Sequence, residues 1–280
     1  PRPFVKWAGG KTQLLPQFEA LYPEATRVRR YLEPFLGSAA VFFQVRRLLR
    51  PRKAVLADGN EELINIYEAI QGNVSRVIRA LSEHRRLHSK EHYYRTRSRR
   101  PRDLSSVERA ARFIYLNKTC FNGLYRVNAG GGFNVPMGRY QDPPILDADN
   151  LRSVALSLQG VELRTAHFRE TLDYARKGDF VYFDPPYHPV SETSYFTSYT
   201  RDSFGPRDQE ELAEVFAALD RRGCRVMLSN SDCPFIRGLY PGFAIHTVRA
   251  RRSINSKADR RGRVSEVVVL NYEPPLLRGK

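Results

Sequence analysis

Cysteine, tryptophan and long apolar runs are all scarce in this chain of 280 residues. Its three cysteines, Cys120, Cys224 and Cys233, lie far apart and never in a Cys-x-x-Cys spacing. An odd number of scattered cysteines argues against a disulfide framework and against a zinc site. We therefore expect no bound metal and a reducing, cytoplasmic setting.

No apolar run approaches the roughly 18 residues that a membrane-spanning helix needs, so we expect no membrane span. The first residues, Pro1-Arg2-Pro3-Phe4, contain no signal-peptide core. Acidic residues are also few, with 30 Asp and Glu against 46 Lys and Arg, a net charge of +16. This excess favours a polyanionic partner, either nucleic acid or an anionic membrane surface. Nucleic acid is the better fit, and general solubility is the simpler alternative.

Hydrophobic residues make up 41% of the chain, enough for a substantial core, and strand and helix patterns alternate along it. The first part predicts strand, helix, strand and helix at 29–35, 39–49, 54–58 and 61–71. The later part predicts a helix at 209–219 and strands at 161–165, 179–184, 224–229, 243–248 and 264–272. This order is typical of an α/β sheet. The last two strands are joined without a helical pattern, so we expect them to pair antiparallel.

A basic segment interrupts this alternation. Residues 72–115 are predicted to be helical and contain many arginines, and residues 121–140 predict a β-hairpin around a run of glycines. We therefore expect one discontinuous α/β domain, residues 1–70 and 155–280. The basic insertion would be residues 71–154.

The tetrapeptide Asp184-Pro185-Pro186-Tyr187 follows an apolar run, which places it at the C-terminal end of a buried strand. Sheets of this class bind ligands outside that end. The carboxylate can accept hydrogen bonds from an amino group, the prolines can fix carbonyls toward a substrate, and the tyrosine can stack on a flat ring. The four residues predict a clamp for an amine on a planar heterocycle. A proline-stiffened turn is the alternative that they leave open.

The N-terminal segment 4–12 holds the only tryptophan, Trp7, and ends in Gly-Lys-Thr. A phosphate-binding loop would need a glycine where this chain has Val5, which argues against an ATP site. We expect instead a close backbone approach at Gly9-Gly10, with Lys11 reaching a carboxylate or a catalytic loop. Simple core packing is the alternative for Trp7.

Two more segments carry candidate residues. Residues 33–38 form a strand-to-helix turn in the position of a nucleotide-binding loop, and Asp58 ends the next strand, where an acid can accept both hydroxyls of a ribose. Capping the helix that follows Asn60 is the alternative role for Asp58. Residues 117–128 mix amide, basic and aromatic side chains at the hairpin entrance. Such a ribbon fits the DNA major groove, unless it is an ordinary solvated hairpin.

Together these segments resemble the Dam-type DNA adenine-N6 methyltransferases nearly from end to end. The matching segments are 4–11, 33–38, 121–126, 133–136 and 184–187. The resemblance implies a Rossmann-like methyltransferase mixed sheet with an inserted helical and β-hairpin target-recognition domain. It also implies S-adenosyl-L-methionine as the methyl donor and double-stranded DNA as the partner. The positions that match the family's cofactor contacts are Trp7, Gly9, Lys11, Phe35, Gly37, Asp58, Phe168 and Asp184.

The resemblance further implies how the reaction proceeds. The target adenine is flipped out of the duplex and stacks on Tyr187, while Asp184 and the Pro185 carbonyl accept its two amino hydrogens. His167, next to Phe168, departs from the acidic residue common in the family. The implied target is a palindromic GATC, and the implied DNA contacts are Lys6, Phe121, Asn122, Leu124, Arg126 and Pro136. Phe121 matches the position of an aromatic residue that inserts into the DNA at the flipped base; that residue is a tyrosine in the family and a phenylalanine here.

Several alternatives stay open at this point. The clamp also suits an amine methyltransferase acting on cytosine N4 or on RNA, and the basic insertion suits a catalytically silent DNA-binding module. The enzyme would either protect DNA alongside a restriction endonuclease or act alone. The basic segment 249–263 either contacts phosphates or is a solvated loop. We expect a monomer.

Overall fold

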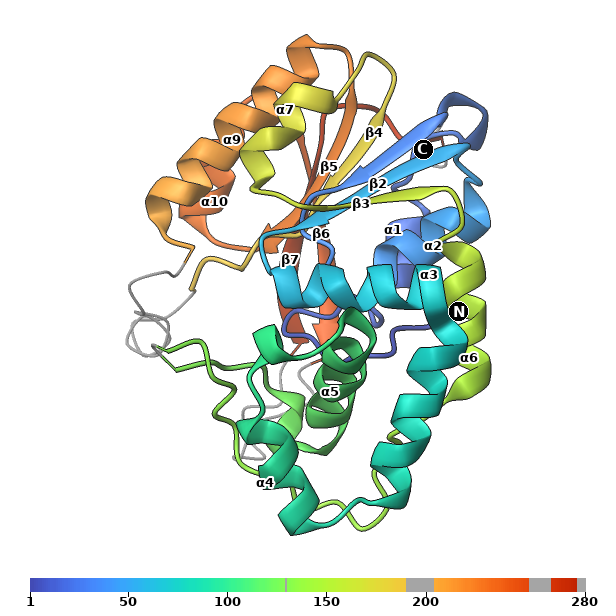
Figure 1. Cartoon of the computed structure of the whole chain (residues 1–280). Helices are drawn as coiled ribbons and strands as arrows, with labels where there is room; N and C mark the ends of the chain where they lie inside the picture. Colours follow the sequence, from blue (N-terminus) through green and yellow to red (C-terminus); the bar gives the residue numbers. More distant parts are fainter. Residues whose placement is uncertain (129, 190–203, 252–262, 276–280) are drawn as a thin grey trace. The chain divides into compact units, whose positions relative to one another are not determined.

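The computed structural model describes residues 1–128, 130–189, 204–251 and 263–275 (Figure 1). The chain forms two compact units. Unit 1 comprises residues 1–10, 37–43 and 60–165, and unit 2 comprises residues 11–36, 44–59 and 166–280. The expected insertion, residues 71–154, falls within unit 1. Its role as a separate DNA-binding domain stays a prediction.

Unit 2 contains a mixed sheet. Its strands are β1 (Arg30–Glu33), β2 (Lys53–Asp58), β4 (Phe180–Phe183), β5 (Arg225–Ser231), β6 (Ala244–Arg251) and β7 (Arg263–Leu270). They lie in the order β2-β1-β4-β5-β7-β6. The first four pair in parallel, and β7 pairs antiparallel with both β5 and β6. The mixed sheet and the antiparallel pairing of the last two strands confirm the sequence prediction.

Helices cover both faces of this sheet. The helices of unit 2 are α1 (Leu15–Glu19), α7 (Thr171–Tyr174), α9 (Pro206–Arg221) and α10 (Pro234–Leu239), while α2 (Ala40–Leu48) has residues in both units. Figure 1 shows α7, α9 and α10 together on one face. On β4, Val181 and Phe183 share a buried cluster with Leu212 of α9, whereas Tyr182 contacts Phe18 of α1. Burial on both faces explains why this strand is continuously apolar.

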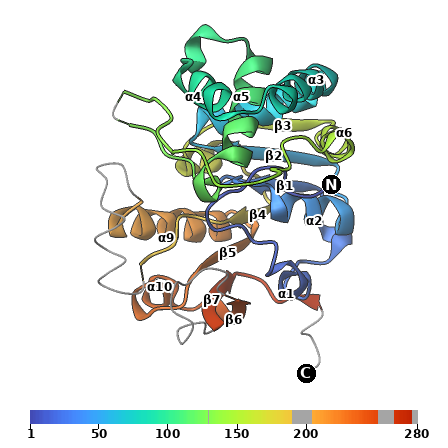
Figure 2. The same ribbon diagram turned by 90° about the horizontal axis from the view of Figure 1, so that it is seen from below.

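Unit 1 is mainly helical. Its elements are α3 (Glu61–Arg86), α4 (Lys90–Ser98), α5 (Ser106–Thr119), α6 (Ala148–Ser157) and strand β3 (Val161–Thr165). Helix α3 packs against α5 and α6, and α4 packs against α5 (Figure 2). The helix predicted over 61–71 continues to Arg86 through a kink at Asn73, where φ is −147°. No helix in the described part of the chain is long and apolar enough to cross a membrane.

The predicted hairpin of unit 1 is a turn with isolated antiparallel bridges rather than regular strands. Val127 pairs with Phe133, and the Asn128 backbone N–H donates to the Gly132 carbonyl at 2.9 Å. The Asn128 Oδ1 atom accepts the Gly132 N–H in return, also at 2.9 Å. A side chain thus supplies a hydrogen bond that a regular ladder would take from the backbone.

Candidate active site and nucleic-acid interface

Three candidate residues lie at one edge of the sheet, where parallel strands end. Leu32 of β1 pairs with Val181 of β4, so Phe35 and Asp184 are level beyond their strands. The register of β1 with β2 likewise brings Phe35 level with Asp58. This edge is where α/β sheets bind ligands.

Asp184 is at the centre of this edge. Its Oδ1 atom lies 2.7 Å from Lys11 Nζ and accepts a hydrogen bond from Ser229 Oγ at 2.9 Å. The Ser229 hydroxyl is also 2.8 Å from the hydroxyl of Tyr182. The prediction that Lys11 reaches a carboxylate is therefore confirmed. The Lys11 side chain is only 4% exposed, and exclusion of water strengthens its attraction to Asp184.

Opposing effects act on the pKa of the Asp184 carboxyl. Burial raises the pKa of the Asp184 carboxyl, while the charge of Lys11 and the hydrogen bonds from Lys11 and Ser229 lower it. Tyr187 lies beside this pair, because Lys11 Nζ is 4.5 Å from the centroid of its ring. Burial raises the pKa of Tyr187 well above its ordinary value, so its hydroxyl keeps its proton and donates to Glu266 Oε2 at 2.6 Å.

A polar network fixes the backbone that follows Asp184. The Gln209 amide donates to the Pro186 carbonyl at 2.9 Å and accepts from Asn230 Nδ2 at 2.9 Å. Asn230 Oδ1 in turn accepts the His188 N–H at 3.2 Å. Within the described residues, no donor reaches the Pro185 carbonyl. The tetrapeptide is therefore a braced loop with an acceptor at Asp184 and another at Pro185, which goes beyond a proline turn.

An aromatic cluster lies at the same sheet edge. The rings of Phe35 and Phe168 are stacked with centroids 5.6 Å apart, and Phe204 lies 5.7 Å from the first and 5.6 Å from the second. The Ala166 N–H donates to the Asp58 carbonyl at 3.2 Å, which ties the segment carrying Phe168 to the end of β2. A flat ring and a strand-end carboxylate are therefore held in one unit.

The alternative role for Asp58, a helix cap, is taken by another residue. Asn60 Oδ1 accepts the Leu63 N–H at 3.2 Å and caps α3. His167 has a local structural role, since its Nδ1 atom accepts the Arg169 N–H at 3.4 Å and caps the short 3-10 turn that begins at Phe168.

The other cofactor candidates, Trp7, Gly9 and Gly37, lie in unit 1. Trp7 is half-buried, with its ring centroid 6.2 Å from that of Phe113 and 5.5 Å from that of Tyr125. A Cβ atom on Gly37 would lie 2.9 Å from Trp7 Cδ1, and the φ of Gly37 is +50°, so this contact requires glycine. These contacts fit the packing interpretation of Trp7, and a cofactor role for the three residues stays a prediction.

The DNA-contact candidates also lie in unit 1. Phe121 and Leu124 are 50% and 48% exposed. Large apolar side chains that are exposed together at a surface indicate a binding site for a partner. The remaining hairpin candidates are exposed as well: Asn122, Arg126 and Pro136. Arg126 Nε donates to Asn134 Oδ1 at 2.7 Å, which orients the guanidinium along the hairpin.

Lys6 lies against the same hairpin. A Cβ atom on Gly123 would lie 2.7 Å from Lys6 Cβ, so glycine is required where the two segments meet. Asn117 holds the Lys6 backbone at both ends, accepting its N–H at 2.7 Å and donating to its carbonyl at 2.8 Å. Lys6 Nζ donates to the Tyr140 hydroxyl at 3.2 Å. Tyr140 could not be predicted from the sequence, because only the fold brings it to Lys6.

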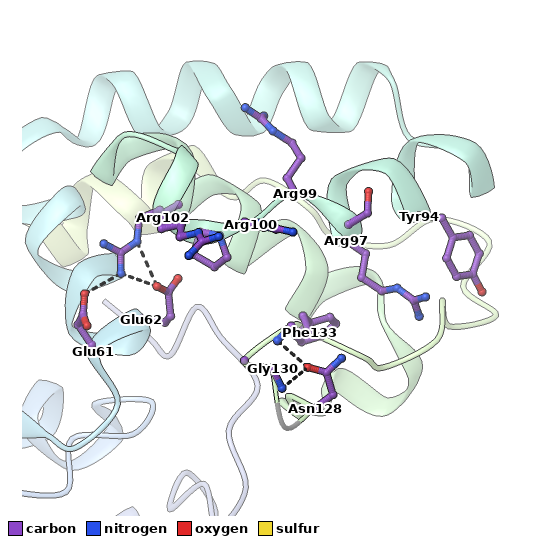
Figure 3. Close-up of a pocket in the computed structure, with 15 residues that line it drawn as sticks. Glu61, Glu62, Tyr94, Arg97, Arg99, Arg100, Arg102, Asn128, Gly130 and Phe133 are labelled. Carbon is purple, nitrogen blue, oxygen red and sulfur yellow. Dashed lines mark hydrogen bonds and ion pairs between the residues drawn. The ribbon is translucent and has the colours of Figure 1, made fainter.

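An open groove of about 820 Å³ lies beside the hairpin in unit 1 (Figure 3). Arginines on its walls are Arg97, Arg99, Arg100, Arg102 and Arg109. Arg109 is paired with Glu61 and Glu62, and Arg99 with Glu108 at 3.3 Å. The positive charge that remains suits a polyanion. The basic segment expected at 249–263 falls mostly outside the described residues.

Comparison with known proteins decides the family. A model described as D12 class N6 adenine-specific DNA methyltransferase matches residues 7–254. The chain belongs to this family. It is 45% identical to a Type II methyltransferase of Lactococcus lactis subsp. cremoris, covering 97% of this chain and 95% of that protein. It is 43% identical to a Type II methyltransferase of Methanocaldococcus jannaschii, and the match covers 97% of this chain and 99% of that protein. A DNA adenine methylase of Escherichia coli is 34% identical, covering 98% and 96%.

This D12-class methyltransferase is therefore an enzyme that acts on DNA, with a Rossmann-like methyltransferase fold and S-adenosylmethionine as its cofactor. The edge of the sheet in unit 2 fits that cofactor chemically. Asp58 offers a carboxylate for hydroxyls, the half-buried Phe35 offers aromatic surface for a purine, and Asp184 offers negative charge for a sulfonium. Phe168 is 2% exposed and supports the ring of Phe35 from behind. In the described residues, no cluster of three or more His, Cys, Asp or Glu side chains could hold a metal ion.

Proposed function

We propose that this methyltransferase takes an adenine out of duplex DNA and methylates its N6 atom at the Asp184–Tyr187 loop. A base inside a duplex has its amino group in a Watson–Crick pair, so it must leave the stack to be modified. The single observation that carries the proposal is the loop itself. Its carboxylate is fixed by Lys11 and Ser229, and its Pro185 carbonyl has no donor within the described residues.

The chain's own groups would position the base as follows. Tyr187 stacks on the purine ring, Asp184 accepts one hydrogen of the amino group, and the Pro185 carbonyl accepts the other. Both acceptors turn the nitrogen lone pair out of conjugation and toward the reacting carbon. S-adenosylmethionine would supply the electrophilic methyl group: its sulfur–methyl bond would break as the bond to N6 forms, and N6 would then release one proton. The protein contributes orientation and electrostatics, since no covalent intermediate is needed.

We infer that the recognition surface is the hairpin face of unit 1 and that the target is GATC. Leu124, Arg126 and Pro136 would read the major groove, Lys6 would contact the first guanine, and Phe121 would enter the gap left by the base. The exposure of Phe121 and Leu124 supports this role, since burying them on DNA removes apolar surface from water. Arg126 has the donor geometry that pairs bidentately with guanine.

We also infer that the enzyme protects DNA in a restriction–modification pair. This inference is supported by the higher identity to two Type II methyltransferases, at 45% and 43%, than to the Escherichia coli DNA adenine methylase, at 34%. The setting would be the cytoplasm, where DNA is found, and its free cysteines are compatible with a reducing environment.

A duplex series tests the target. Oligonucleotides carrying GATC, each single-base variant of it, or a scrambled site would be incubated with the protein and radiolabelled cofactor. Label should enter the GATC duplex and fall by about 5- to 150-fold with each variant, which corresponds to about 1–3 kcal/mol per mismatched pair. Equal labelling of the scrambled duplex would reject GATC, and label in none would reject methyl transfer to this site.

A further inference from the structure

Glu266 is a half-buried acidic side chain at the start of the apolar run of β7. Its neighbours on β7, Val267, Val268 and Val269, are all 0% exposed. Burial raises the pKa of the Glu266 carboxyl, because an apolar setting disfavours its charge. The hydrogen bond that offsets this cost comes from the Tyr187 hydroxyl, which donates to Glu266 Oε2 at 2.6 Å. Such a short bond to a carboxylate is of the strong, charge-assisted kind.

Glu266 completes a set of contacts that hold the Tyr187 ring. The ring follows a proline pair whose second carbonyl is bound by Gln209 at 2.9 Å. Lys11 Nζ lies 4.5 Å from the ring centroid, on one face. The hydroxyl at the far end is bound by Glu266. A tyrosine ring has two rotatable side-chain bonds, so fixing its base and its tip leaves one orientation.

The orientation matters because a stacked base must lie parallel to the ring. With Lys11 over one face, a flat heterocycle stacks on the opposite face. A tilt of the ring would move the base away from the Asp184 carboxylate, and misplacement of about 1 Å can cost 100-fold in rate.

We propose that Glu266 is a positioning residue for the target base, acting through the Tyr187 hydroxyl to fix the plane on which the adenine stacks. The inference rests on the proposed function, since it needs Tyr187 to be the stacking surface. It assigns a role to the tyrosine hydroxyl, which stacking alone does not use. It also explains why the acidic side chain of Glu266 on β7 contacts Tyr187, although the two residues are 79 positions apart in the sequence.

A double-mutant cycle tests the coupling. Tyr187→Phe removes the hydroxyl but keeps the ring, and Glu266→Ala removes the acceptor. Each should lower kcat by about tenfold, as loss of one hydrogen bond to a charged group allows, with KM for DNA changing less than twofold. The double variant should be no slower than the slower single variant. If the fold loss in kcat of the double variant equals the product of the two single losses, the proposal is overturned, because the two groups would then act independently.

The conservative variant and a base probe separate positioning from folding. Glu266→Gln keeps an acceptor oxygen and should recover most of kcat, whereas Glu266→Ala should not. Duplexes with 2-aminopurine at the mapped target report stacking, since an aromatic ring quenches its fluorescence. The bound probe should be brighter in Glu266→Ala than in the unmodified enzyme and quenched again in Glu266→Gln. Equal quenching in all three proteins would contradict the proposal even if kcat falls.

Two controls keep the result interpretable. Glu214→Gln changes an exposed acid on α9 of the same unit and should leave kcat and the fluorescence unchanged. Asp184→Ala separates the two levels of inference. If that variant still methylates at the normal rate, the proposed function of the loop fails. If it is inactive while the Glu266 and Tyr187 losses multiply, only the positioning role fails.

Discussion

Lys11 Nζ lies 2.7 Å from Asp184 Oδ1, and this ion pair joins the N-terminal segment to the end of β4. Lys11 is almost fully buried and Asp184 is 19% exposed, so the pair is weakly screened. The lysine offsets the cost of burying the carboxylate that, in the proposed function, accepts a hydrogen bond from the adenine amino group. Its ammonium also lies over Tyr187, so one side chain organises both parts of the proposed clamp.

Replacing the carboxylate should stop the reaction without stopping binding. We expect Asp184→Ala to lower methyl transfer by at least about 10²–10³-fold, the cost of losing one positioned polar group at a reacting centre. DNA affinity, measured by fluorescence anisotropy, should change less than twofold. A variant with near-normal turnover would contradict the role of Asp184. A parallel loss of DNA affinity would instead indicate a folding defect.

The pH profile should report the Lys11–Asp184 pair. The active form of Asp184 is the carboxylate, so activity falls as the pH drops through its pKa. Lys11 lowers that pKa against the effect of burial, and removing it raises the pKa further. In Lys11→Met the acid limb of the kcat/KM profile should move to higher pH, because the charge that lowers the pKa of Asp184 is gone. Lys177→Met, at an exposed site of the same unit, should leave the limb in place. An unmoved limb in Lys11→Met would contradict the coupling.

Arg126 should control sequence discrimination. In Arg126→Ala we expect the preference at one base pair to relax by about 1–3 kcal/mol, while the other positions keep theirs. The measurement is kcat/KM on the single-base duplex series. A uniform loss on every sequence would assign Arg126 to a phosphate. Asn134→Ala is the matched comparison, because it removes the partner of Arg126 at 2.7 Å but keeps the guanidinium.

The arginines of the groove in Figure 3 should contribute a salt-dependent part of the affinity for duplex DNA. Arg97→Ala and Arg100→Ala should each weaken binding to all duplexes alike and reduce the slope of log affinity against log salt by about one. Arg152→Ala on α6, another exposed arginine of unit 1 that is 58% exposed, serves as the control. Unchanged slopes in both groove variants would place the DNA backbone elsewhere.

A histidine pair should make unit 1 sensitive to acid. His84 Nδ1 lies 2.9 Å from His92 Nε2, and burial lowers the pKa of His84 to about 4. An unfolded histidine titrates near 6.5, so the folded state loses stability as the pH falls from about 6.5 toward 4, by about 1–3 kcal/mol. Urea unfolding at pH 7.5 and 4.5 measures the loss, which should shrink in His84→Gln. The same loss in both proteins would exclude His84 as its source.

Much of the fold could be predicted from the sequence, because two central strands are apolar runs that end in an acidic residue. Apolar runs ending in Asp58 and Asp184 gave both the strands and the edge where they meet. The helices α1, α6, α7 and α10 were not predicted. The three of these in unit 2 are only 5, 4 and 6 residues long, too short for a periodic pattern to be recognised.

The site was less predictable than the fold, since contacts between distant segments leave no local pattern. Lys11 was expected to find a carboxylate, but nothing in the sequence indicated which. Ser229, Glu266 and Tyr140 were missed altogether. Each looks ordinary in its own segment, and it acquires a role only when strand pairing or hairpin closure brings it to Asp184, Tyr187 or Lys6.

The most direct test of the account is the identity of the modified base. Duplex DNA incubated with the protein and S-adenosylmethionine would be digested to nucleosides and analysed by mass spectrometry, with Asp184→Ala in parallel. The account predicts N6-methyladenine from the unmodified enzyme and none from the variant. Methyl groups on cytosine N4, or N6-methyladenine formed equally by Asp184→Ala, would contradict it.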